Sequence, residues 1–153
     1  MENTVRVKKV SSETDLNKAF AIRMRVFVKE QGVPAEMELD RDDKRAIHFL
    51  ATVVKKPVGT ARLVIRHGNA KIGRMAVLKS WRRRGVGTTL LQRAVAAART
   101  LGAREIYLHA QVPVIGFYET MGFRPVGLVF DEAGIPHQKM IFRRRKVTVK
   151  NRK

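Results

Sequence analysis

A basic turn with two glycines lies between an apolar strand pattern and a helical pattern in residues 71–91, KIGRMAVLKSWRRRGVGTTLL. Gly85 and Gly87 lack the Cβ atoms that would keep a ligand away from the backbone. The first N–H groups of a helix have no partner within the helix, and the helix dipole adds partial positive charge there. The turn therefore predicts a phosphate site. The expected ligands are the guanidinium groups of Arg82, Arg83 and Arg84 and the backbone amides of Arg84, Gly85, Val86, Gly87 and Thr88.

Two common phosphate motifs do not fit this turn. It lacks the glycine, lysine and hydroxyl spacing of a P-loop, and it differs from the G-x-G-x-x-G run of dinucleotide-binding turns. The turn instead matches the pattern R-x-x-G-x-G, with Arg82 as the first residue and Gly85 and Gly87 as the glycines. Glycine pairs beside arginines also occur in ordinary turns, so the flanking elements must decide between these interpretations.

An acidic segment stands out in this basic chain. Residues 30–45, EQGVPAEMELDRDDKR, contain six of the thirteen acidic residues. One interpretation is a negative rim that attracts a cationic amine, with Glu30 and Glu36 as substrate-binding residues. Another is a solvated loop whose charges balance nearby arginines. A third is a calcium loop, although the aspartates of this segment lack the central glycine and distal glutamate of an EF-hand.

Three residues are candidates to take a proton from an amine: Glu36, Glu38 and His109. A carboxylate or imidazole near neutrality suits this task, directly or through water. His109 alternates with Tyr107 and Gln111, so strand geometry puts these three side chains on one face. That face is either open to a substrate or part of the core. No group of His, Asp and Glu has metal-ligand spacing, so we expect no metal.

Apolar runs and helical periodicities predict the elements that position these groups. In chain order they are a strand at 4–10, a helix from Ser12 to the break at Gly32 and Pro34, three antiparallel strands at 46–54, 60–66 and 71–78, the phosphate turn with its helix, a strand at 104–111, a helix at 113–121, and strands at 123–130 and 137–145. The helix after the turn has the clearest apolar stripe, made of Val86, Leu90, Leu91, Ala94, Val95, Ala98 and Leu101, with Gly102 as C-cap.

Length and composition bound the class of protein. A chain of 153 residues with 44% hydrophobic content fits one globular domain with an ordinary core. The absence of cysteine excludes disulfides, thiolate nucleophiles and cysteine-ligated zinc. No apolar run approaches the roughly 20 residues that span a bilayer, and MENTVRVKK lacks the apolar middle of a signal peptide. We therefore expect a cytoplasmic protein without membrane contact.

The formal net charge of +19 is spread over the whole chain. Residues 143–153 hold seven lysines or arginines and no acid, so the remainder still carries +12. Such a field favours polyanions, including nucleic acid. For the tail, the alternative is a solvated basic surface that keeps the protein soluble.

With its elements placed, the chain resembles the GNAT superfamily of N-acetyltransferases over nearly its full length. The local matches are GTARL, RMAV followed by RRRGVG, LHAQ and FYETMGF. In addition, VFVKEQGVPAEMELD and GIPHQKM resemble a bacterial subgroup related to the ElaA and YjcF proteins. The resemblance implies an α+β fold with three layers, α-β-α, around a central mixed, mostly antiparallel sheet of about seven strands with a splay between strands 4 and 5.

The resemblance also implies roles for individual residues. Acetyl-CoA would be the phosphate carrier, with its pyrophosphate on the turn. The implied coenzyme ligands beyond the turn are Met75, Ala76, Val77, Gln111 and Phe117. The Val77 amide would face the developing oxyanion, and Gln111 stands where many relatives have an asparagine. Tyr118 would protonate the departing thiolate; the alternative is a half-buried packing tyrosine.

The activity implied is direct acetyl transfer from the thioester of acetyl-CoA to a primary amine, on a cationic small molecule or a lysine side chain. Residues 1–146 would form a single domain of this kind, as a monomer or homodimer, followed by a basic tail at 147–153. A competing hypothesis is a basic protein that uses the same fold to bind nucleic acid or ribosomes. A third is an enzyme whose tail docks on a protein bound to nucleic acid.

Overall fold

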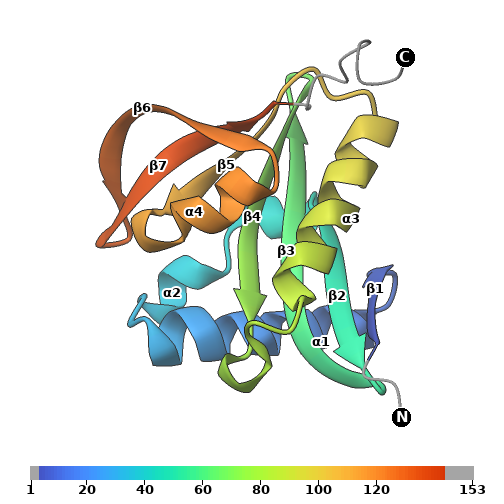
Figure 1. Ribbon diagram of the computed structural model, residues 1–153. Coiled ribbons are helices and arrows are strands. Elements are labelled where there is room, and N and C mark those ends of the chain that lie inside the picture. The colour runs from blue at the N-terminus through green and yellow to red at the C-terminus, as the bar shows by residue number, and fades with distance from the viewer. Residues whose placement is uncertain (1–3, 144–153) are drawn as a thin grey trace. The chain divides into compact units, whose positions relative to one another are not determined.

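The described part of the chain, residues 4–143 of a computed structural model, forms two compact units that divide between Ile106 and Tyr107. Figure 1 shows the strands and helices of both units. The basic tail at 147–153 lies outside the described residues. The single-domain organisation of residues 1–146 stays a prediction.

The first unit contains an antiparallel meander, as predicted. Its three strands are β2 (Ile47–Val53), β3 (Lys56–Arg66) and β4 (Asn69–Val77). The first strand, β1 (Val5–Lys9), pairs antiparallel with β2, so the hydrogen-bonded order is β1-β2-β3-β4. The register of β3 against β4 shifts between Thr60 and Arg62, opposite a position where Arg74 has a positive φ of 47°. This irregularity precedes the last residues of β4, which are candidates for binding the coenzyme.

The helical elements of the first unit are α1 (Glu13–Arg23), a π-helix η1 (Met24–Glu30), α2 (Ala35–Glu38), two 3-10 turns, η2 (Arg41–Lys44) and η3 (Lys79–Trp81), and α3 (Val86–Thr100). The Ser12 side chain caps α1 by accepting a hydrogen bond from the Asp15 amide, as its sequence position predicted. Helix geometry stops before Gly32, whose φ is +79°. In residues 4–143, no helix is long and apolar enough to cross a membrane.

Helices α1 and α3 cover opposite faces of the meander. Leu50 of β2 belongs to a core cluster with Ala19 and Ile22 of α1. Its neighbour Phe49 points to the other face, where the Arg93 guanidinium of α3 lies 5.9 Å from the ring centroid. Gly59 of β3 lets α3 approach closely, because a Cβ there would lie 2.8 Å from a Val86 methyl group.

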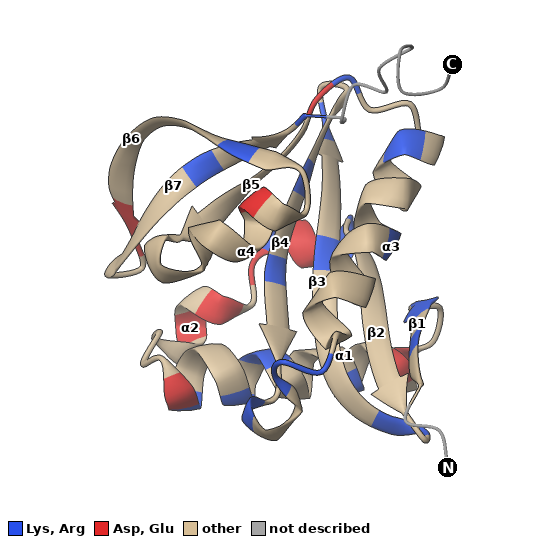
Figure 2. Cartoon of the chain, in the orientation of Figure 1, with Lys and Arg blue, Asp and Glu red and all other residues tan. Residues whose placement is uncertain are grey.

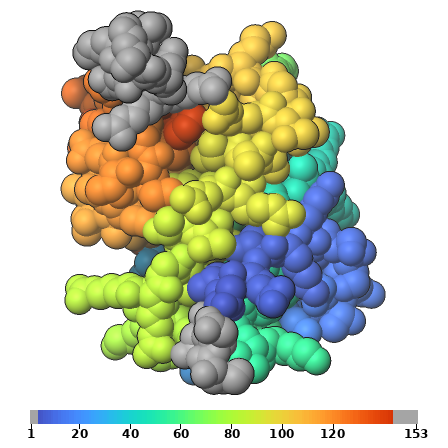
Figure 3. Space-filling view, turned by 45° about the vertical axis from the view of Figure 1, so that its right-hand side comes forward, coloured from blue at the N-terminus to red at the C-terminus, as the bar shows by residue number. Residues whose placement is uncertain are grey.

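The apolar stripe of α3 is confirmed by burial. Its buried residues are Val86, Leu90, Leu91, Ala94, Val95 and Ala98. Leu101, which the sequence placed on the same stripe, is 55% exposed because it follows the last helical residue, at the C-cap. Gly102 ends the helix with a φ of +77°, as predicted. Figure 3 shows the outer side of α3, in yellow to yellow-green, at the molecular surface.

The second unit holds the last three strands and a short helix. Strand β7 (Ile135–Phe142) lies between β5 (Ile106–Gln111) and β6 (Phe123–Glu132), and both of its pairings are antiparallel. The hairpin is tighter than predicted, because Ala133 and Gly134, with φ of 53° and 79°, form a two-residue turn. Helix α4 (Ile115–Thr120) follows the 3-10 turn η4 (Val112–Val114) and ends before Gly122.

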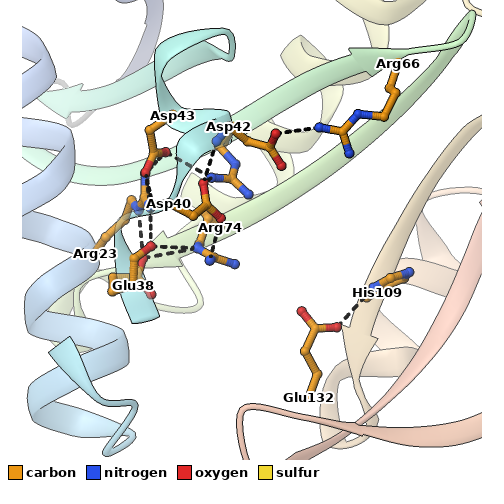
Figure 4. Close-up of polar contacts among 10 residues, drawn as sticks. Arg23, Glu38, Asp40, Asp42, Asp43, Arg66, Arg74, His109 and Glu132 are labelled. Atoms are coloured by element: carbon orange, nitrogen blue, oxygen red, sulfur yellow. Dashed lines mark hydrogen bonds and ion pairs between the residues drawn. The ribbon is translucent and has the colours of Figure 1, made fainter. Parts of the chain in front are cut away.

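Arg23 is a buried cation at the C-terminus of α1, and only 1% of its side chain is exposed. It donates from Nε to a Glu38 carboxylate oxygen at 2.7 Å and from Nη1 to an Asp43 carboxylate oxygen at 2.7 Å. Its Nη2 donates to the Glu38 carbonyl oxygen at 2.8 Å. Figure 4 shows these bonds, which tie the acidic segment to α1.

Two further arginines bind the same carboxylates from the sheet. Arg62 of β3 donates to Asp40 at 2.7 Å and to Asp43 at 3.0 Å. Arg74 of β4 lies 3.3 Å from Glu38 and donates to Asp40 at 3.1 Å. We call this group the arginine–carboxylate cluster; it consists of Arg23, Arg62, Arg74, Glu38, Asp40 and Asp43. It fixes α2 and η2 between α1 and the meander.

Replacing Arg23 with Met should destabilise the protein strongly, because it leaves the buried carboxylate of Glu38 without its main partner. Removal of one partner of a buried ion pair typically costs about 3–5 kcal/mol. Urea unfolding measures the loss, with Arg25→Met, at an exposed position of η1, as control. A loss below about 1 kcal/mol for Arg23→Met would contradict the account.

Acid should weaken the cluster through Asp43. Burial opposes ionisation of Asp43, but hydrogen bonds from Arg23, the Asp40 amide and Arg62 outweigh it and lower its pKa from 3.8 to about 2. A lowered pKa stabilises the fold above 3.8, and this contribution disappears as pH falls through about 2. The stability difference between wild type and Asp43→Asn, measured by urea unfolding, should therefore shrink from pH 5 to pH 2. A constant difference would refute this linkage.

Candidate active site

The start of α3 has the form predicted for a phosphate site. Gly85 is the N-cap residue in the left-handed conformation, with a φ of 83°, and a Cβ at this position would meet no atom within 4 Å. In the described chain, no side chain caps this helix start. The Gly85 carbonyl accepts hydrogen bonds from the amide and hydroxyl of Thr89. The amides of Val86, Gly87 and Thr88 thus belong to a helix start without a side-chain cap.

The three arginines before α3 differ in their contacts and backbone conformation, although Figure 2 shows one blue stretch leading into the helix. The Arg84 guanidinium lies 5.0 Å from the ring centroid of Trp81, a cation–π contact. Arg83 is in the left-handed region, with a φ of 64°. Arg82 donates to both carboxylate oxygens of Glu30, at 2.6 and 2.8 Å.

Arg82 also binds the backbone at the end of β4, a contact that the sequence did not predict. Its Nε donates to the Val77 carbonyl oxygen at 2.9 Å. Glu30, at the end of η1, therefore binds the Arg82 guanidinium, which in turn binds the backbone of β4. In this structure the Glu30 carboxylate is already engaged by Arg82. The contact of Arg82 with phosphate stays a prediction, and so does the contact of Glu30 with substrate. No motif spacing indicates the pair, because the two residues are 52 positions apart.

The Val77 amide points away from β3. The next residue, Leu78, donates its amide hydrogen bond to Val58 of the β3 side, and successive amides of a strand point in opposite directions. By the same alternation, the backbone groups of Ala76 face its partner Thr60 on β3. The Val77 amide thus points to the side of β4 that faces away from β3, as the proposed oxyanion donor requires. The backbone N–H and C=O of Ala76 point toward β3 instead.

The acidic segment is largely neutralised by arginines. Five of its six acids have an arginine partner: Glu30, Glu38, Asp40, Asp42 and Asp43. Glu38 is 2% exposed, inside the arginine–carboxylate cluster. Glu36 is exposed on α2 and makes no ion pair within residues 4–143. The geometry favours the balanced loop over the open acidic rim.

In the second unit, Tyr118 of α4 is held by aromatic neighbours. Its ring lies 5.1 Å from Phe117 and 6.1 Å from Phe123, centroid to centroid, both edge-on. Burial raises the pKa of Tyr118 to about 12. The phenol therefore keeps its proton at neutral pH, as a proton donor must.

The two faces of β5 differ as the alternation predicted. Ile106, Leu108 and Ala110 are buried, whereas the face with His109 is only half-buried, so this face is not closed core. His109 Nδ1 lies 3.0 Å from a carboxylate oxygen of Glu132 in β6. Figure 4 shows this pair. Sequence reasoning missed Glu132, because β7 separates its strand from β5 and only the strand order brings the two residues together.

Across residues 4–143, no three His, Asp or Glu side chains lie close enough together to hold a metal ion.

Comparisons with known proteins identify the family. The family model of the acetyltransferase (GNAT) domain matches residues 8–144. The uncharacterised N-acetyltransferase YjcF of Bacillus subtilis is 40% identical over 131 residues, which cover 85% of this chain and 94% of YjcF.

Solved structures give the same result. The crystal structure of Escherichia coli ElaA superimposes with a TM-score of 0.82 at 27% identity, covering 92% of this chain and all of ElaA, 100%. That of an acyl-CoA N-acyltransferase from Pseudomonas aeruginosa gives 0.79 at 29% identity, with coverage of 92% and 99%. The predicted fold class and kinship with ElaA and YjcF are confirmed. The chain belongs to the GNAT family and is an N-acetyltransferase.

Proposed function

We propose that this acetyltransferase takes its acetyl group from acetyl-CoA and transfers it directly to a primary amine. The observation that carries the proposal is the start of α3, where a left-handed glycine leads into a helix terminus without a side-chain cap. Backbone N–H groups and the helix dipole at such a terminus favour an anion. The pyrophosphate of coenzyme A would supply it.

The proposed coenzyme ligands follow from this placement. The amides of residues 84–88 would bind the pyrophosphate, with Arg83 and Arg84 adding positive charge. Met75 and Val77 would contact the pantetheine arm, and Gln111 and Phe117 are proposed on family resemblance alone. The open space at the Cβ position of Gly85 supports a close approach of phosphate to the backbone.

The proposed chemistry is a direct transfer. The nitrogen of a neutral amine attacks the thioester carbonyl carbon, and the carbonyl oxygen takes up negative charge, which the Val77 amide would stabilise. When the intermediate collapses, the C–S bond breaks, the sulfur leaves with the bonding pair, and Tyr118 would give it a proton. The amine nitrogen loses one proton in turn, so the products are an N-acetyl amine and a free thiol.

The acceptor is proposed as a primary amine on a small molecule or a lysine side chain. A preference for cationic amines depended on an open acidic rim, and the pairing of five acids with arginines weakens that argument. Glu36 remains the exposed acid of the segment with no ion pair in the described chain. Glu38 as a proton acceptor is less favoured, because two arginines already bind it.

Replacing Gly85 with Ala should weaken acetyl-CoA binding about tenfold or more, because the new methyl group enters the space proposed for phosphate and strains the N-cap. Gly102→Ala is the matched control: Gly102 has a φ of +77° at the other end of α3 and also faces open space. Both variants should lose similar stability, and calorimetry should find weaker binding only for Gly85→Ala. Equal affinities would contradict the site.

Tyr118→Phe should lower kcat about 100-fold or more while the affinity for acetyl-CoA stays unchanged, because the change removes only a proton donor. Thiol release measures kcat, calorimetry measures affinity, and the melting temperature shows whether the fold is intact. Wild-type turnover in a folded variant would remove Tyr118 from the mechanism.

A further inference from the structure

One face of the second unit's sheet gathers ionisable and aromatic side chains. Register pairs His109 of β5 with Lys139 of β7, and His137 of β7 with Phe130 of β6, so these side chains share a face. The polar and aromatic residues of this face include Tyr107, His109, Gln111, Arg124, Phe130, Glu132, His137 and Lys139. The proposed transfer has so far used only Gln111 from this face.

His109 is fixed in one orientation by its neighbours. Its Nδ1 lies 3.0 Å from Glu132, and the Phe130 ring meets it edge-on with 5.0 Å between centroids. An ionised carboxylate only accepts hydrogen bonds, so Nδ1 carries the hydrogen in this contact. In the neutral ring, Nε2 then holds the lone pair. The His109 side chain is 25% exposed, which leaves it accessible to a ligand.

We infer that His109 and Glu132 form a proton-accepting dyad for the acceptor amine. The inference rests on the proposed function and names the base that it lacks. A proton moves from the ammonium group of the acceptor to His109 Nε2, while the electron pair of the N–H bond stays on nitrogen and makes the amine nucleophilic. Glu132 stays ionised as a positioning residue; it selects the tautomer and stabilises the imidazolium.

The surroundings favour this dyad over the carboxylates of the acidic segment. Glu38 is bound by two arginines, and Glu36 is a solvated side chain on α2. The dyad instead combines partial exposure with a fixed tautomer. The other titratable or charged groups of its face are Tyr107, Arg124, His137 and Lys139, with the Lys139 ammonium 4.7 Å from the Tyr107 ring centroid.

The tautomer is measurable without an acceptor. Long-range ¹H–¹⁵N NMR spectra of the labelled protein should show the His109 imidazole, identified by its loss in His109→Gln, with hydrogen on Nδ1 and a bare Nε2 at alkaline pH. Glu132→Gln should remove this preference, and Asp131→Asn, the adjacent residue on the opposite face of β6, should leave it unchanged. Hydrogen on Nε2 in the wild type would overturn the inference.

Kinetics test the role of the dyad. With acetyl-CoA and spermidine, kanamycin or Nα-blocked lysine, kcat should fall about 100-fold in His109→Gln and about tenfold in Glu132→Gln. The controls His67→Asn, in an exposed turn, and Asp131→Asn should keep wild-type turnover.

The outcomes separate the two proposals. Normal acetyl-CoA binding with full turnover in both dyad variants would overturn the dyad and keep the proposed function. Failure of the wild type to bind acetyl-CoA would overturn the proposed function. If none of the three amines is acetylated, the NMR result still decides whether His109 Nε2 can accept a proton.

Discussion

The acidic segment depends on one buried cation. Arg23 brings a positive charge into the interior at the end of α1, and the fold supplies Glu38 and Asp43 to neutralise it. Because a buried charge without a partner is very costly, these ion pairs favour residues 35–45 staying in this position. Arg62 and Arg74 join the same carboxylates to the meander, so a segment without a regular strand or long helix is held from two sides.

The start of α3 shows the opposite arrangement. Five of the six carboxylates of the acidic segment are bound by arginines, whereas the helix start after Gly85 has no side-chain cap in residues 4–143. In the structure, the Arg82 side chain connects Glu30 to the Val77 carbonyl. The contrast between a largely neutralised acidic segment and an uncapped helix start supports the proposal that the start of α3 binds the anion.

Local signals allowed much of this to be predicted. The spacing of Gly85 and Gly87, the apolar stripe of α3 and the cap at Ser12 are set within a few residues, and their patterns indicated the right elements. Pairings across long separations were not predictable. Glu30 and Arg82 are 52 residues apart, and the sequence offered the acids and arginines without saying which would meet.

In the second unit, too, contacts between residues far apart in the chain could not be predicted. Alternation placed Tyr107, His109 and Gln111 on one face, but it could not show whether that face was core. The partner of His109 came from β6, two strands away in the sheet and 23 residues away in the chain. Such a pair emerges only from the order β5-β7-β6.

The central claim is that the uncapped start of α3 binds the phosphates of acetyl-CoA. Isothermal titration calorimetry with acetyl-CoA and with acetylpantetheine, which keeps the thioester and lacks the pyrophosphate and nucleotide, tests it most directly. The account predicts saturable binding of acetyl-CoA, weakened by added salt, and at least about 100-fold weaker binding of acetylpantetheine. Equal affinity for the two compounds, or no binding of acetyl-CoA, would contradict it.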